Sequence, residues 1–191
     1  MGLAASGILV AGMVAGEAGA QQRATSASAA VAACGTMNVN FDVTAGPAVV
    51  STSQPGGASA GAAQGAQAPE GKALVYLVED IIHIPLSSTT LRAGMDGNWV
   101  GATKNLMYVS FVVDPGVRHV CVSVQGHAWG QLERGITLLR LNAEAGKTYY
   151  LRARMTQGKD VLPLVLLDAV DEDEGQLLVQ TAVPAVWHPK K

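Results

Sequence analysis

The stretch LMYVSFVVDPGVRHVCVSVQ, from Leu106 to Gln125, decides the fold class. Two runs of β-branched and aromatic residues, Leu106 to Val113 and Val117 to Gln125, flank the turn Asp114-Pro115-Gly116. In the second run apolar residues alternate with polar ones, which is typical of a strand with one buried face. The stretch therefore predicts two strands joined as a hairpin.

The same pattern extends over the rest of the C-terminal half. Thr137 to Ala143 and Lys147 to Met155 flank the turn Glu144-Ala145-Gly146, which predicts a second hairpin of similar chemistry. Arg92 to Ala102 contains Asp96-Gly97, the strongest short hairpin signal, because both residues of that turn type take positive φ. Reversals at this close spacing indicate an all-β domain.

Two further strands and a helix complete the expected domain. Lys72 to Glu79 is a nearly continuous apolar run and predicts a central strand, whereas Pro163 within Val161 to Leu167 favours an edge strand or a bulge. The acidic run Asp171 to Glu174 predicts a helix start before Gln176 to Gln180. About seven strands at this spacing predict a small antiparallel β-sandwich over residues 71–191, or else a partly closed barrel.

The N-terminus has the pattern of an export signal. Leu3 to Gly16 is an apolar run of signal-peptide length, and Ala18-Gly19-Ala20 forms a small-x-small cleavage site, so we expect a signal peptide over residues 1–20. The usual positive charge before the apolar run is absent. A transmembrane helix is the weaker interpretation, because spanning a bilayer takes about 20 apolar residues. The sequence therefore predicts an extracytoplasmic protein of the periplasm, the envelope or the medium.

An arm and a linker separate this signal from the domain. Residues 21–43 form the arm, in which Met37 to Val43 alternates apolar and polar residues like a short strand. Residues 44–70 are rich in Gly, Ala, Ser, Gln and Pro and carry no charge before Glu70. Such a composition buries too little apolar surface to offset the entropy of ordering, so we expect a disordered linker.

The chain has two cysteines, Cys34 and Cys121. In an oxidising compartment an even, minimal count predicts one disulfide bond. A second interpretation is lipidation, because the segment Val31 to Gly35 has the form of a lipoprotein box around Cys34. Lipidated Cys34 or an uncleaved signal would attach the protein to a membrane.

Composition and motifs exclude several functional classes. The formal net charge of -2 argues against nucleic-acid binding. The chain contains no nucleophile elbow, phosphate-binding glycine loop or paired-histidine zinc motif, and its four histidines lack ligand spacing. We therefore predict no enzyme, no cofactor and no metal. The alternative is an enzyme whose site is assembled across strands, for which His119, Asp168 and Asp171 are available groups.

Aromatic residues are the candidates for contact with a partner. The loop Gln125 to Gly135 is long for a hairpin and contains His127 and Trp129, and Trp99 follows the Asp-Gly turn. Core packing is the competing role for Trp99. We expect these three residues to contribute to any surface for a protein or an envelope component.

Several segments in order resemble an uncharacterised bacterial family of small exported or lipid-anchored proteins, domain of unknown function 2846. The resemblance covers about two-thirds of the chain, and its residues are Gly71 to Tyr76, Gly94 to Gly101, Asp114 to Gly116 with His119, Glu144 to Tyr150, and Asp171 to Gly175 with Leu177 and Leu178. It implies a β-sandwich of the cell envelope, without an established activity or catalytic residues.

These observations favour a non-catalytic envelope or secreted module that binds a protein or a surface component. A structural or stress-protective protein, whose linker spaces the domain from a membrane or wall, is the first alternative. An enzyme with a site built across strands is the second.

Overall fold

The computed structural model describes residues 34–35, 39–47, 49–52, 58–60, 66–80, 89–125, 136–158 and 161–191. The predicted signal peptide, residues 1–20, lies outside these residues, as do the predicted partner residues His127 and Trp129. No helix in the described part of the chain has the length and apolar character needed to cross a membrane.

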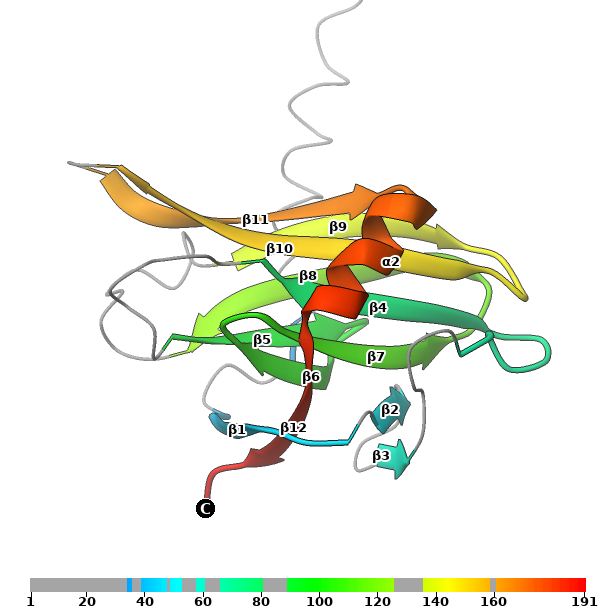
Figure 1. Ribbon diagram of the computed structural model, residues 1–191, viewed down its shortest axis with the longest axis horizontal. Coiled ribbons are helices and arrows are strands. Elements are labelled where there is room, and N and C mark those ends of the chain that lie inside the picture. The colour runs from blue at the N-terminus through cyan, green and yellow to red at the C-terminus, as the bar shows by residue number, and fades with distance from the viewer. Residues whose placement is uncertain are drawn as a thin grey trace, which may run out of the picture.

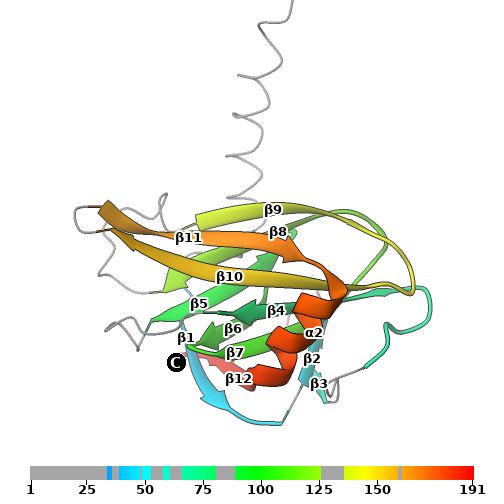
Figure 2. The same ribbon diagram turned by 45° about the horizontal axis from the view of Figure 1, so that its top comes forward.

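The described strands form two sheets that pack face to face, which confirms the predicted all-β sandwich (Figures 1 and 2). The first sheet has the order β1 (Phe41–Ala45), β12 (Val183–Pro189), β7 (Met107–Val113), β4 (Ala73–Glu79), β10 (Thr148–Gly158) and β11 (Val161–Val170). β2 (Val49–Thr52) pairs with β7 and with β3 (Ala58–Ala60). The second sheet has the order β6 (Asn98–Lys104), β5 (Thr90–Met95), β8 (Gly116–Gln125) and β9 (Ile136–Ala143).

The first sheet is mixed, whereas the sequence predicted antiparallel pairing. β4 pairs with β10 in parallel, and β7 pairs in parallel with both β12 and β2. Parallel neighbours cannot be joined by a tight turn and need a longer connection. Here those connections run through strands of the second sheet or over the surface. The described strands also outnumber the predicted seven.

Two of the three predicted hairpins are wrong. β7 lies in the first sheet and β8 in the second, so the turn at Asp114-Pro115-Gly116 crosses between the sheets. The turn at Glu144-Ala145-Gly146 likewise carries the chain from β9 to β10 in the other sheet. A turn sequence sets a reversal of direction, but the partner of the next strand depends on where its apolar face is buried. The third hairpin is confirmed: Asp96 and Gly97 have φ of 46° and 87° between the paired β5 and β6.

β4 is the centre of the core, as predicted. All seven of its residues are buried, because both of its faces are covered. Val75 and Leu77 face the second sheet in the main core, and Leu74 and Tyr76 lie in a separate cluster under α2 (Glu172–Thr181). Figure 1 shows α2 crossing the outer side of this sheet.

The helix α2 starts at Glu172, so three of the four acidic residues lie in its first turn and only Asp171 precedes it. Asp171 is the N-cap residue, but its side chain makes no capping hydrogen bond. The carboxylates of Glu172, Asp173 and Glu174 therefore favour the helix through its dipole, and the predicted helix start at the acidic run is confirmed.

Segments before residue 71 also join the sheets. β1 pairs with β12, and Phe41 is only 2% exposed. β2 and β3 fall inside residues 44–70, for which we expect a linker, and both pair within the first sheet. The placement of Pro163 is as predicted, since β11 ends the described strand order of its sheet. Beside it, the hydroxyl of Thr137 on β9 donates to the carbonyl of Val165, and Figure 2 shows β9 next to β11.

Candidate functional site

The outer face of the second sheet is covered by part of the predicted arm, residues 21–43. From here on, the N-terminal arm means its described residues 34–35 and 39–41. Side chains that face outward from β5, β6 and β8 fasten this arm in place. The first fastening is the predicted disulfide bond between Cys34 and Cys121, which joins Cα atoms 5.5 Å apart across 87 residues. In the chain-entropy description, a loop of this length stabilises the fold by up to about 4–5 kcal/mol. One sulfur atom cannot carry both bonds, so this disulfide and lipidation of Cys34 exclude each other.

The second fastening is Arg92, whose side chain is 2% exposed. Its guanidinium donates to the carbonyl of Val39 at 2.8 Å and to the hydroxyl of Ser123 at 2.9 Å. Burial lowers the pKa of Arg92, yet the ordinary value of arginine is so high that the group keeps its charge. A buried cation therefore binds a backbone carbonyl of the arm through a charge-assisted hydrogen bond.

The third fastening is Gln125, at the end of β8. The backbone N–H of Phe41 donates to Gln125 Oε1 at 2.6 Å, and Gln125 Nε2 donates to the carbonyl of Phe41 at 2.9 Å. One side-chain amide thus satisfies both backbone groups of a residue, as a neighbouring strand would. These two bonds hold the beginning of β1 against the second sheet.

Trp99, a predicted partner residue, lies in this same layer. It packs beside the disulfide, its ring centroid is 4.7 Å from the guanidinium carbon of Arg92, and it meets Phe41 edge-on at 6.0 Å. A Cβ atom on Gly35 would lie 2.6 Å from its ring, so the backbone of the arm passes directly against it. The ring of Trp99 therefore packs against the arm. The residue is half-buried, and only its exposed part can contact a partner.

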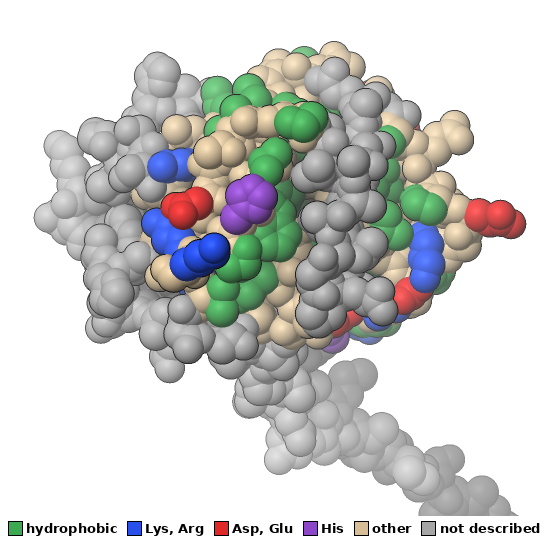
Figure 3. All heavy atoms as spheres, turned by 90° about the horizontal axis from the view of Figure 1, so that it is seen from below, with side chains coloured by type: hydrophobic (Ala, Val, Ile, Leu, Met, Phe, Trp, Pro, Cys, Tyr) green, Lys and Arg blue, Asp and Glu red, His purple; other side chains and the backbone are tan. Residues whose placement is uncertain are grey.

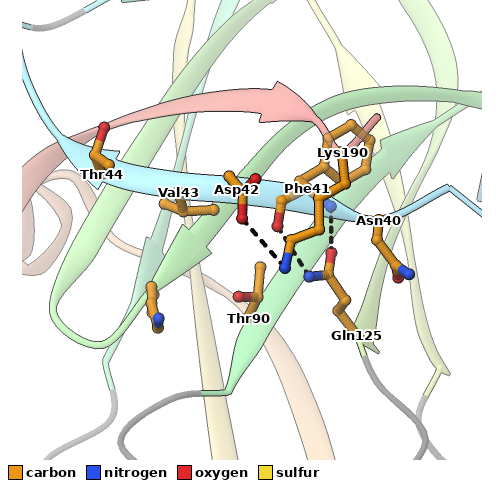
Figure 4. A pocket seen from close by; sticks show the side chains of 9 residues that line it. Asn40, Phe41, Asp42, Val43, Thr44, Thr90, Gln125 and Lys190 are labelled. Carbon is orange, nitrogen blue, oxygen red and sulfur yellow. Dashed lines mark hydrogen bonds and ion pairs between the residues drawn. The ribbon is translucent and has the colours of Figure 1, made fainter.

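A pocket of about 410 Å³ lies where β1 passes the end of the second sheet (Figure 4). Figure 4 shows β1 forming one wall, with Thr90 and Gln125 across from it. Lys190 forms an ion pair with Asp42 at 3.1 Å at the rim. The lining residues are Asn40, Phe41, Asp42, Val43, Thr44, Thr90, Lys104, Gln125 and Lys190.

This pocket has an excess of positive charge. Lys104 forms no ion pair with a carboxylate of the described residues, whereas Lys190 is paired with Asp42. Lys104 acts electrostatically on the carboxyl group of Glu79, which is 1% exposed. Burial raises the pKa of Glu79 to about 8, against the opposing effects of Thr103, Asn105 and Lys104. Glu79 is therefore mostly protonated at neutral pH and does not neutralise Lys104.

Glu79 also has a structural role beside the pocket. Its Oε1 accepts a hydrogen bond from the backbone N–H of Asn105 at 3.0 Å, and Asn105 has a φ of 58° in the turn between β6 and β7. Its Oε2 has no hydrogen-bond partner of normal geometry among the described residues. The carboxyl group thus holds the turn that follows Lys104.

Figure 3 shows the molecule from the side on which β1 and β12 lie in Figure 1. Basic, acidic and histidine side chains gather there beside hydrophobic ones. This face therefore combines charge of both signs with apolar surface.

The groups available to a catalytic site have separate partners. His119 Nδ1 lies 4.0 Å from Asp96 Oδ1 at one turn, and Asp168 pairs with Arg154 between β10 and β11. Asp171 caps α2. Among the described residues no three His, Cys, Asp or Glu side chains are placed to hold a metal ion.

Sequence reasoning missed Arg92, Gln125 and Thr90. Arg92 and Gln125 belong to predicted strands, and Thr90 lies two residues before the predicted start of one of them. The missing information is what covers the polar face of those strands. One pattern in the sequence could have indicated the covered face. Arg92 and Gln125 are long polar residues on the face that also carries Cys121, and the segment around the disulfide partner of Cys121 must cover that face.

No family model, curated protein or solved structure matches this chain. The resemblance to domain of unknown function 2846 stays a prediction, and the function has to be inferred from the residues of the chain.

Proposed function

We propose that this protein is a non-catalytic binding module of an extracytoplasmic compartment, and that its binding site is the pocket beside β1. The compartment is supported by the disulfide, since such bonds form and persist in oxidising environments. The proposal also includes attachment to the cell envelope and membership in the family domain of unknown function 2846. The structural and enzymatic alternatives stay predictions.

The observation that carries the proposal is the rigid construction of the pocket. Five consecutive residues, from Asn40 to Thr44, form one wall, and the arm that leads into them is fixed by a covalent bond, a buried cation and a paired amide. A site that is ordered before its ligand arrives loses less conformational entropy on binding. The volume also falls within the roughly 300–1,000 Å³ typical of ligand pockets.

The experiment is an NMR titration of the ¹⁵N-labelled protein with two probes, a set of short synthetic peptides and soluble peptidoglycan fragments. We expect at least one probe to shift the amide signals of Val43, Thr90 and Gln125. The variant Lys104→Glu replaces the positive charge of this lysine by a negative one, and it is expected to change the shifts that the probe causes. Lys147→Glu, in an exposed turn between β9 and β10, is the control and is expected to respond like the wild type.

Shifts confined to the turns around Asp96, Asp114 and Gly146 would place binding at a different end of the sandwich and overturn the proposal. Unchanged spectra with both probes would overturn it as well.

A further inference from the structure

The backbone of β1 is hydrogen-bonded on one side only among the described strands. In its antiparallel pairing with β12, the N–H of Lys190 donates to the carbonyl of Asn40, and the N–H of Gly46 donates to the carbonyl of Pro184. Residues that exchange such bonds alternate along an antiparallel pair. The even-numbered residues of β1 therefore face β12, and the N–H and C=O groups of Phe41, Val43 and Ala45 point to the opposite edge.

At the first of these three residues the outer edge is already occupied. The amide of Gln125 bonds to both the N–H and the C=O of Phe41. A primary amide has the same donor and acceptor as a peptide group. Gln125 thus shows, within the molecule, which kind of group this edge binds.

The next outward residue along the edge is Val43, and it lines the pocket together with Thr90 and Lys104. No described strand pairs with Val43 on this side. The pocket consequently offers the N–H and the C=O of Val43 as an unpaired strand edge. Beside them lies Lys104, which has no carboxylate partner among the described residues. Exposed strand edges of this kind are templates for pairing with another chain.

We infer that the pocket binds an extended acidic segment of a partner protein, which adds to the outer edge of β1 as a short strand and places a carboxylate opposite Lys104. This inference rests on the proposed function and specifies its ligand. Backbone pairing at Val43 supplies affinity, and the charge of Lys104 selects acidic over basic segments. Gln125 occupies the edge at Phe41, and Ala45 lies outside the pocket lining, so the added strand pairs with this edge at Val43.

The test uses the peptide acetyl-Thr-Val-Glu-Val-Thr-amide in the NMR titration with the labelled protein. We expect saturable shifts at Val43, Thr90 and Lys104, and weaker binding when the peptide glutamate is replaced by glutamine and weaker still with lysine. Two N-methylated versions, one methylated at both valines and one at the glutamate, remove hydrogen bonds from opposite edges of the peptide. One version is expected to lose binding and the other to keep it, because a strand pairs through alternate residues.

Two pairs of protein variants locate the contact. Val43→Pro removes an N–H that points away from β12, and we expect about tenfold weaker binding for one lost hydrogen bond. Ala45→Pro removes the equivalent N–H outside the pocket lining and is the control, with binding unchanged within about twofold. Lys104→Gln is expected to weaken binding about two- to fivefold, as for a partly exposed charge pair, and Lys147→Gln to leave it unchanged.

The outcomes separate this inference from the proposed function. Peptidoglycan fragments that shift the pocket signals while the peptides do not would overturn the peptide ligand and leave the binding pocket standing. Equal loss of binding with both N-methylated peptides would overturn strand addition. A concentration-dependent dimer in sedimentation that Val43→Pro abolishes, without peptide binding, would assign the edge to a second copy of this chain and overturn the inference.

Discussion

The side-chain amide of Gln125 pairs with the backbone of Phe41 through two hydrogen bonds, of 2.6 and 2.9 Å, although the residues are 84 positions apart. The pair joins the end of β8 to the start of β1 and forms one end of the pocket. Because Phe41 is buried, its backbone groups have no ready access to water as a substitute partner.

Gln125→Ala is expected to lower the free energy of unfolding by about 1–3 kcal/mol, because it leaves a buried N–H and a buried C=O unpaired. Urea denaturation followed by tryptophan fluorescence measures the change. Gln176→Ala is the matched control, since Gln176 bonds to Glu172 on the exposed surface of α2, and its effect is expected to stay within about 0.5 kcal/mol. Equal effects of the two substitutions would show that the Phe41 pairing does not stabilise the fold.

Removal of the disulfide by Cys34→Ser with Cys121→Ser is expected to cost about 2–5 kcal/mol of stability, because the loop between the two residues is long. Intact mass of protein recovered from the envelope fraction, with and without reduction, tests the bond directly. We expect a chain beginning at Gln21 that gains the mass of two hydrogen atoms on reduction. A mass beginning at a diacylated Cys34 would contradict both the bond and the cleavage site.

Arg92→Lys is expected to destabilise the protein by about 1–3 kcal/mol even though the charge is kept. The single ammonium of lysine cannot reproduce the two directed bonds that the guanidinium makes with Val39 and Ser123. Ser123→Ala removes one of these bonds and should cost less, about 0.5–1.5 kcal/mol. Thermal and urea unfolding would reveal the difference, and a neutral Arg92→Lys would mean that the arm does not depend on this contact.

The pH dependence of stability is expected to report on Glu79. Burial raises its pKa in the folded state from an ordinary 4.5 to about 8, so the folded protein holds a proton that the unfolded chain releases between these values. Stability linked to Glu79 is therefore complete below about pH 4.5 and declines as the pH rises towards 8, by up to about 1.4 kcal/mol per unit. Glu79→Gln stays neutral and keeps an acceptor for Asn105.

The measurement for Glu79 is urea denaturation of the wild type and Glu79→Gln at pH 5, 6, 7 and 8. The variant should gain on the wild type as the pH rises. A constant difference across this range would mean that the folded carboxyl titrates normally.

Gly175→Ala should destabilise the protein by about 1–3 kcal/mol, although alanine favours a helix over glycine by about 1 kcal/mol. A Cβ atom at this position would lie 2.1 Å from the ring of Tyr150, at the root of a side chain that cannot swing away. Leu177→Ala on the exposed side of α2 is the control and should change stability by about 0.5 kcal/mol or less. A more stable Gly175→Ala protein would show that α2 can lift from the sheet without loss.

Much of the local structure follows from nearby residues. Runs of apolar and β-branched residues located β1 and the strands from β4 to β11, but not β2, β3 or β12. Asp96-Gly97 located the hairpin between β5 and β6, and the burial of both faces of β4 followed from its unbroken apolar run. The cysteine count led to the disulfide bond. The strand patterns and the hairpin depend on interactions between residues close together in the sequence. The disulfide pairing is unambiguous because the chain has only two cysteines.

The pairing of strands and the pocket depend on contacts between distant segments. Asp114-Pro115-Gly116 reverses the chain whichever sheet receives β8, and the crossing between sheets arises because β7 and β8 bury their apolar faces against each other's layers. Arg92 and Gln125 have the pattern of solvent-exposed strand residues, yet the arm that begins at Cys34 covers them. Alternation tells which residues share a face of a strand; what covers that face is set by chain segments far away in sequence, through the total apolar surface that the fold can bury.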